Sequence, residues 1–335
     1  MRAFLLLAQL LFVLFLLYVT LNVMPALAAH QSFTVVSFLH GFIQMVTAMF
    51  TGNWGVGSFE IYTGPYYQLY ADYVPGSIEL AIFGLGISAL IAYPVSLLAG
   101  WGRLPGVDAS ARLGTLAGAL LPAFIIGTLV LFAVFFGFVN YFHDIPDNGL
   151  IPSPQWINQY YVDSPPAWLV SYTYTRPTGF PLIDAAIHGA WTFEAITFTK
   201  TLMQATVIAI AYVAIFVRHA RVVVVSARQE LHITAARARG LSERTLLWQH
   251  TGRRVLPTFL LIFALTIPAY IGTQCVVEGY FIDPGIGYLT LASLTQGLFE
   301  PFEAGVFLIA ILVLVWTFAV DLIVYRLDPR GVGRT

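Results

Sequence analysis

Six long apolar runs constrain the fold of this sequence more than any other feature. They lie at residues 3–28, 75–100, 113–138, 201–217, 255–277 and 304–325. An α-helix needs about 20 mostly apolar residues to cross a bilayer, and the runs lack the two-residue alternation of membrane strands. Only 10% of residues are charged, and the mean hydropathy is +0.79. The sequence therefore predicts an all-α polytopic membrane protein with six transmembrane helices.

The basic residues predict how the chain is oriented. Of the 16 lysine and arginine residues, all except Arg176 and Lys200 lie before the first run, after the sixth, or in alternate loops between them. Lys and Arg concentrate in cytoplasmic loops. Both termini are therefore expected in the cytoplasm, and segments 29–74 and 139–200 outside it.

The first run has a second interpretation, because ALAAH after it resembles the cleavage site of a secretory signal. The apolar run from Ala3 to Met24 is longer than the usual signal core of about 7–15 residues. We therefore expect a retained membrane helix. The predicted parts are an N-terminal helix, an extracytoplasmic segment, a core of five membrane helices and a cytoplasmic tail, at 1–30, 31–74, 75–326 and 327–335.

The two outside segments have distinct compositions. In the first, VVSFLHGFIQMVTAMF is too short to cross a bilayer and is expected to form an interfacial helix. The second, 139–200, is rich in Tyr, Trp, Pro and acidic residues, and loops of this length are usually functional. It could contact another protein or cover a pore mouth. Alternatively, it could lie as a cap on the membrane interface, where Trp and Tyr are also common.

Several catalytic and cofactor motifs are absent from the sequence. There is no G-x-x-x-x-G-K-[ST] phosphate loop, and the single lysine, Lys200, has no glycine nearby. No HExxH, CxxC or G-x-S-x-G occurs, and Cys275 is the only cysteine. We therefore expect no catalytic residue, metal site or cofactor in this chain. No nucleic-acid partner is expected either, and the surrounding partner is the lipid bilayer.

Few ionisable residues lie within the runs, which disfavours a proton- or sodium-coupled transporter. Glu278, in CVVEGYF, is the best candidate for a functional buried carboxylate. The alternative is an interfacial residue at the outer end of the fifth helix.

The densest group of arginines lies in the predicted cytoplasmic loop 218–254, which contains HITAARARGLSERTLLWQH. The residues from Glu230 to Arg239 are good helix formers, and Gly240 is typical of a helix end. Ser242 can cap a second helix, with Glu243 favourable in its first turn. The loop is therefore predicted to form a helix, a glycine turn and a second helix that continues through Pro257.

Three alanines, Ala235, Ala236 and Ala238, make the first of these helices slim enough to approach a partner's groove closely. Arg237 and Arg239 offer fixed positive charge beside it. The arginines alone would favour a plain positively charged loop. The alanines, the glycine and the second cap together are harder to explain in that way.

The stretch TAARARGLSE at 234–243 resembles the EAA loop of ABC importer permeases, a coupling helix that docks on an ATPase subunit. The general motif has Glu where this chain has Thr234, and proline where it has Arg253. At both positions this chain resembles the dipeptide/oligopeptide-type permeases. Other segments resemble that group in order along the chain: PGSIELAIFGLGISALIAYPVSLLAG, LPAFIIGTLVLFAVFFG, NGLIPSPQ, PTGFPLIDAAIHGAW, VVEGYFIDPGIGYL and DLIVYRLDPRG.

This resemblance implies the type I ABC importer permease fold in the cytoplasmic (inner) membrane of a prokaryote. It also implies a contact loop for the ATPase, formed by Thr234, Ala235, Ala236, Arg237, Ala238, Arg239, Gly240, Leu241, Ser242 and Glu243. A possible pathway or gating role falls on Glu278, Pro284 and Gly285.

The implied partners are a second homologous permease in a heterodimer, two ABC ATPases that bind ATP and Mg²⁺, and an extracytoplasmic substrate-binding protein. The implied solutes are peptides or similar molecules, with oligosaccharides or nickel complexes as alternatives within the same group. Two other classes stay open from the residues. One is a self-contained secondary transporter or channel. The other is a membrane enzyme that uses Asp144, His188 or Glu194 of the 139–200 loop.

Overall fold

The computed structural model describes residues 2–23, 34–59, 62–102, 125, 129, 178–187, 191–281, 283 and 285–327. The third predicted membrane helix, 113–138, lies outside the described residues except for positions 125 and 129. Most of loop 139–200 also lies outside them, including Asp144 and His188.

Within the described part, four helices are long and apolar enough to cross a membrane. They belong to α4 (Tyr66–Trp101), α10 (Trp191–Arg228), the continuous helix from Glu243 to Tyr280, and α15 (Phe299–Leu327). Each covers one of the predicted runs and extends beyond it. The first predicted run is occupied by α1 (Arg2–Tyr18) and the π-helix η1 (Val19–Val23).

The chain forms two compact units, Met1–Ser77 with Ile282–Thr335, and Ile78–Phe281. These units are defined by packing, whereas the predicted parts are defined by membrane topology. Helix α4 contributes residues to both units.

The first unit contains α1, η1, α3 (Val35–Thr51), the beginning of α4, α14 (Ile286–Thr295) and α15. Helix α3 covers the predicted interfacial helix, and the side chain of Thr34 caps it by accepting from the backbone N–H of Ser37. A short hairpin that was not predicted from the sequence follows α3. Its strands β1 (Val56–Phe59) and β2 (Tyr62–Pro65) pair antiparallel, with Val56 opposite Pro65.

A buried cluster holds the hairpin, α4, α14 and α15 of the first unit together. Its fully packed members are Phe59, Tyr66, Leu69, Tyr70, Ile286, Leu289 and Ala304. The Tyr70 hydroxyl donates to the carbonyl of Pro301 at 2.7 Å, and the N–H of Ile286 donates to Ser77 Oγ at 2.9 Å. Buried polar groups are thus paired where these helices meet.

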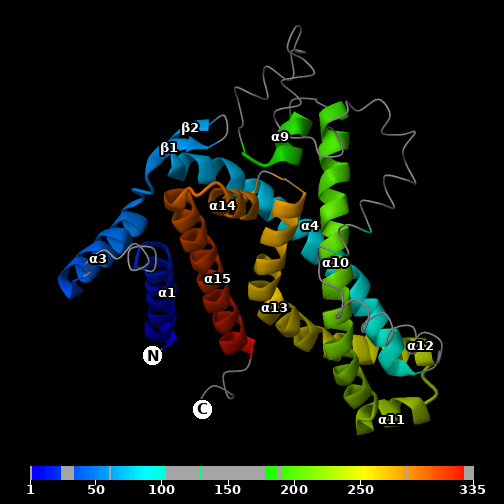
Figure 1. The fold of residues 1–335 in the computed structure, drawn as a ribbon. Helices are drawn as coiled ribbons and strands as arrows, with labels where there is room; N and C mark the ends of the chain where they lie inside the picture. The colour runs from blue at the N-terminus through cyan, green and yellow to red at the C-terminus, as the bar shows by residue number, and fades with distance from the viewer. Residues whose placement is uncertain are drawn as a thin grey trace. The chain divides into compact units, whose positions relative to one another are not determined.

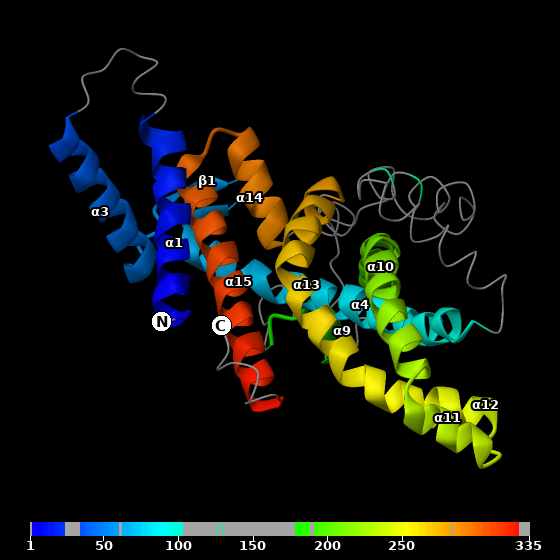
Figure 2. The same ribbon diagram turned by 90° about the horizontal axis from the view of Figure 1, so that it is seen from below.

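The second unit contains the rest of α4, α9 (Pro181–Ile187), α10, α11 (Leu231–Ala238), α12 (Glu243–Thr245), η2 (Leu246–Gly252) and α13 (Arg253–Tyr280). Helices α10 and α13 pack together, and the hydroxyl groups of Tyr212 and Thr273 lie 3.1 Å apart. Helix α9 lies beside the first turns of α10, whereas α11 and α12 lie at its other end (Figures 1 and 2).

Candidate functional site

The arginine-rich loop folds as the sequence predicts. Gly240 has φ of +83°, a left-handed conformation that glycine adopts without strain. Its N–H donates to the carbonyl of Arg237 at 3.0 Å, and that of Leu241 donates to Ala236 at 3.3 Å. This pair of bonds is the Schellman arrangement that ends many helices. The helix–glycine part of the prediction is therefore confirmed.

The second helix also begins where the sequence predicts. Ser242 is its N-cap and accepts a hydrogen bond from the N–H of Thr245 at 3.2 Å. Glu243 lies in the first turn, and the helix continues through η2 into α13 with Pro257 inside it. The helical path therefore leads from the loop directly into a candidate membrane span.

One face of α11 is anchored in the second unit. Ile233 is fully buried in a cluster built from α4, α10, η2 and α13, and Ala236 packs against the same cluster. The other buried members of this cluster are Leu97, Trp101, Val224, Ala227, Leu246, Leu247 and Val255. Ala236 therefore faces partly inward, whereas the sequence had placed it with Ala235 and Ala238 among the alanines expected to meet a partner.

The opposite face of α11 is slim and exposed. Thr234, Ala235 and Ala238 are exposed, and Leu231 is 87% exposed. Residues at these spacings share one face of a helix. Between Leu231 and the C-cap Arg239, no large side chain stands on this face of α11, so another protein's backbone can approach the helix closely.

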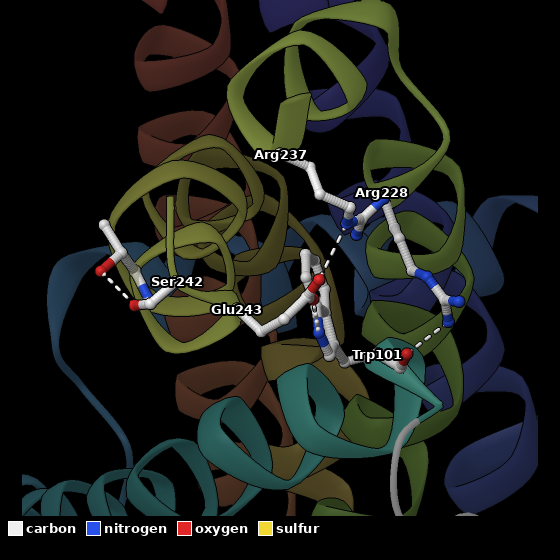
Figure 3. Close-up of polar contacts among 6 residues, drawn as sticks. Trp101, Arg228, Arg237, Ser242 and Glu243 are labelled. Carbon is white, nitrogen blue, oxygen red and sulfur yellow. Dashed lines mark hydrogen bonds and ion pairs between the residues drawn. The ribbon is translucent and has the colours of Figure 1, made fainter. Parts of the chain in front are cut away.

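Arg237 and Glu243 are engaged with each other and with the end of α4 (Figure 3). Arg237 Nε donates to Glu243 Oε1 at 2.8 Å, and Trp101 Nε1 donates to Glu243 Oε2 at 3.0 Å. The guanidinium carbons of Arg228 and Arg237 both lie 5.9 Å from the centre of the Trp101 ring. An Arg228 nitrogen also donates to the Trp101 carbonyl.

The tryptophan carries most of the stability of this cluster. Trp101 is only 4% exposed, and removal of a buried tryptophan side chain costs about 3–5 kcal/mol. The Arg237 and Glu243 side chains are 42% and 22% exposed, so their ion pair contributes only about 0–1 kcal/mol. The polar contacts therefore orient the Arg237, Glu243 and Trp101 side chains more than they stabilise the fold.

A second ion pair ties the start of α11 to the start of α13. Glu230 Oε2 lies 2.6 Å from an Arg254 nitrogen and 3.2 Å from His232 Nδ1. The loop is thus fixed at both ends of α11, while the charges of Arg239 and Arg244 stay exposed.

Residues 92–331 match the profile of a known family, described as "Binding-protein-dependent transport system inner membrane component". The matched region is more than half of the chain and includes the whole arginine-rich loop. The chain belongs to this family. The family consists of inner-membrane transport components, and the four apolar helices of this chain fit that description. Membership of this family disfavours the alternatives of a self-contained transporter, a channel or a membrane enzyme.

Several named permeases are similar to this member of the family. The metal-staphylopine import system permease protein CntB of Staphylococcus aureus and the oligopeptide transport system permease protein AppB of Bacillus subtilis are each 33% identical over 129 residues. These matches cover 38% of this chain and 41% of either relative. The di/tripeptide transport system permease protein DppB of Pseudomonas aeruginosa is 25% identical over 295 residues, which cover 79% of this chain and 81% of that protein.

The candidate pathway residues of this permease are not brought into one described site. Glu278 lies near the end of α13, is 1% exposed, and accepts from Gln274 Nε2 at 2.7 Å. Gly285 precedes α14 in the other unit, with extended backbone, and Pro284 lies outside the described residues. A role for these three residues stays a prediction. Among the residues that the structure describes, no three His, Cys, Asp or Glu side chains form a possible metal site.

Two residues that surround the loop, Trp101 and Arg228, were not predicted from the sequence. A tryptophan at the end of an apolar run resembles any interfacial tryptophan, and Arg228 resembles any cytoplasmic arginine. The only local sign is that Trp101 is followed by Gly102, whose left-handed backbone ends α4.

Proposed function

We propose that this permease is a transmembrane subunit of an ATP-driven ABC importer, and that the exposed face of α11 docks on an ATPase subunit. The observation that carries the proposal is the slim face of Thr234, Ala235 and Ala238 on a helix whose other face is buried. A helix anchored on one side and bare on the other can transmit a push from a partner. The resemblance of TAARARGLSE to a coupling helix supports the same role.

The proposed assembly has the composition that the loop's resemblance implies. A second, homologous permease completes the pathway as a heterodimer. Two ABC ATPases bind ATP and Mg²⁺, and an extracytoplasmic binding protein delivers the solute. This chain itself performs no hydrolysis. It supplies an element that alternates between two states, and the ATPases supply the free energy.

The proposed topology has six membrane helices with both termini in the cytoplasm. It rests on the charge distribution, which places 14 of the 16 basic residues on one side. The arginine-rich loop is then cytoplasmic, where an ATPase can reach it. The outside loop 139–200 is then on the side of the binding protein.

We propose peptides or similar small solutes as the cargo. AppB and DppB are named for oligopeptide and di/tripeptide transport. CntB is named for metal-staphylopine import, and its matched stretch is as similar to this chain as that of AppB is. A metal complex is therefore the second candidate. Calorimetry on the cognate binding protein with a tripeptide mixture and with nickel–histidine separates them. Binding of the nickel complex without binding of tripeptides would contradict the peptide assignment.

Co-purification of the ATPase subunits tests the docking face. Ala235→Glu and Ala238→Glu place a large charged side chain on the bare face without disturbing buried residues. Both are expected to reduce ATPase recovery with the tagged permease at least about tenfold, because one steric and charge mismatch costs on the order of 1.4 kcal/mol or more at an interface.

The matched control is Gln249→Glu, which adds the same charge at an exposed position on η2. It is expected to retain the ATPase. Equal recovery from wild type and both α11 variants would contradict docking at this face.

A further inference from the structure

Trp101 of α4 contacts three other helices, α10, α11 and α12. Its indole N–H donates to Glu243 of α12, and its carbonyl accepts from Arg228 of α10. Its ring lies 5.9 Å from the guanidinium carbon of Arg237 on α11. Trp101 is the last residue of α4 and is 4% exposed. One buried residue is therefore held through its indole N–H, its backbone carbonyl and its ring.

Glu243 links Arg237 to Trp101, because it accepts a hydrogen bond from each. Arg237 extends from the last turn of α11 and donates to one carboxylate oxygen of Glu243. The other oxygen accepts from Trp101. One route from a tilt of α11 to Trp101 therefore runs through the Glu243 carboxylate, beside the direct contacts that Arg237 and Ile233 of α11 make with the ring and its cluster.

Gly100 of α4 lies closely against Val224 of α10 next to Trp101. A Cβ atom on Gly100 would lie 2.6 Å from Val224 Cβ and 3.2 Å from the carbonyl oxygen of Arg221. With so little space between them, neither helix end can move far at this point without moving the other. Displacement of Trp101 would therefore shift the ends of both helices.

We propose that Trp101 is a positioning residue that transmits movement of α11 to the adjoining ends of α4 and α10. The inference rests on the proposed docking of α11 on an ATPase. Charge neutralisation alone would require only that Glu243 lie near any of the loop's arginines. It would not require the directional hydrogen bond from a buried indole at the end of a different helix.

Hydrogen–deuterium exchange on the purified permease–ATPase complex in nanodiscs tests the proposal without any transported solute. Exchange is compared between the nucleotide-free complex and the complex trapped with ATP and vanadate. In wild type, nucleotide is expected to change exchange in α11 and also at residues 93–101 and 221–228. In Trp101→Phe, the ring remains but the N–H donor is lost. The response of α11 is then expected to persist, while the response at the two helix ends is reduced.

Trp248→Phe is the matched control, because Trp248 is 39% exposed on η2. It is expected to respond as wild type does at all three segments. A general loss of stability would raise exchange in both nucleotide states and leave their difference in place. The difference between states therefore separates positioning from a purely structural role.

Glu243→Gln removes the charge that pairs with Arg237 and is the second variant. Because both substitutions break the same route through the Glu243 carboxylate, the Trp101→Phe and Glu243→Gln double variant is expected to lose no more response than either single variant. Additive losses, or full responses at 93–101 and 221–228 in either single variant, would overturn the role of Trp101 alone. Absence of any nucleotide response in wild-type α11 would instead overturn the docking proposal, and the role of Trp101 with it.

Discussion

At the scale of single residues, Gly100 sets how closely α4 and α10 approach. Its Cβ position is already occupied by Val224, so Gly100→Ala must force the two helices apart. Such overpacking costs about 1–3 kcal/mol. We expect Gly100→Ala to lower the thermal unfolding midpoint of the purified protein and to disturb Trp101 next to it.

Gly86, in the same helix, provides the matched control. Nothing lies within 4 Å of a Cβ built on Gly86, and alanine in a helix is favoured over glycine by about 0.5–1 kcal/mol. Gly86→Ala is therefore expected to keep or raise the midpoint. If both substitutions shift the midpoint equally, the close approach at Gly100 is wrong.

Gly240 is the second residue whose identity follows from its backbone. With φ of +83° and open space around its Cβ position, it is restricted by conformation and not by contacts. Gly240→Ala is expected to weaken the end of α11 by about 1 kcal/mol, because alanine is strained in the left-handed region. Amide exchange over residues 231–241 should then rise about fivefold. Gly240→Asn, which tolerates this conformation better, should raise it less, and a larger rise for Asn would contradict the assignment.

At the scale of elements, α3 has three distinct faces. Phe38, Phe42, Met45 and Met49 pack against the α1 side of its own unit. Two further stripes are exposed. The apolar stripe consists of Val36, Leu39, Ile43 and Phe50, and the polar stripe of Ser37, His40, Gln44, Thr47 and Thr51. Neighbouring apolar and polar stripes are what a helix lying in the membrane interface requires.

Spin labels on α3 test this placement. A nitroxide at Leu39→Cys is expected to be more accessible to oxygen, which dissolves in lipid, than to a water-soluble nickel chelate. Gln44→Cys on the polar stripe is the control and should show the reverse preference. Equal preference at both positions would contradict an interfacial α3.

At the scale of the whole molecule, the parts of the fold that depend on local patterns were predictable. The apolar runs locate α4, α10, α13 and α15, because a membrane helix must be long and apolar. Gly240 and Ser242 locate the turn and the restart in the loop, because their roles depend only on neighbouring backbone.

Contacts between distant segments were not predictable in the same way. The Trp101 cluster joins residues separated by up to 142 positions, and it depends on the close packing of α4 and α10 at Gly100. No periodic pattern reports such a contact. The β1–β2 hairpin was missed because its strands are only four residues long.

ATP hydrolysis by the reconstituted importer tests the central claim most directly. The permease pair and both ATPases are placed in liposomes, and hydrolysis is measured with and without the cognate binding protein. We predict several-fold stimulation by the binding protein, lost in Ala235→Glu and kept in Gln249→Glu. Stimulation that is the same when this chain is omitted, or that is unaffected by Ala235→Glu, would contradict the account.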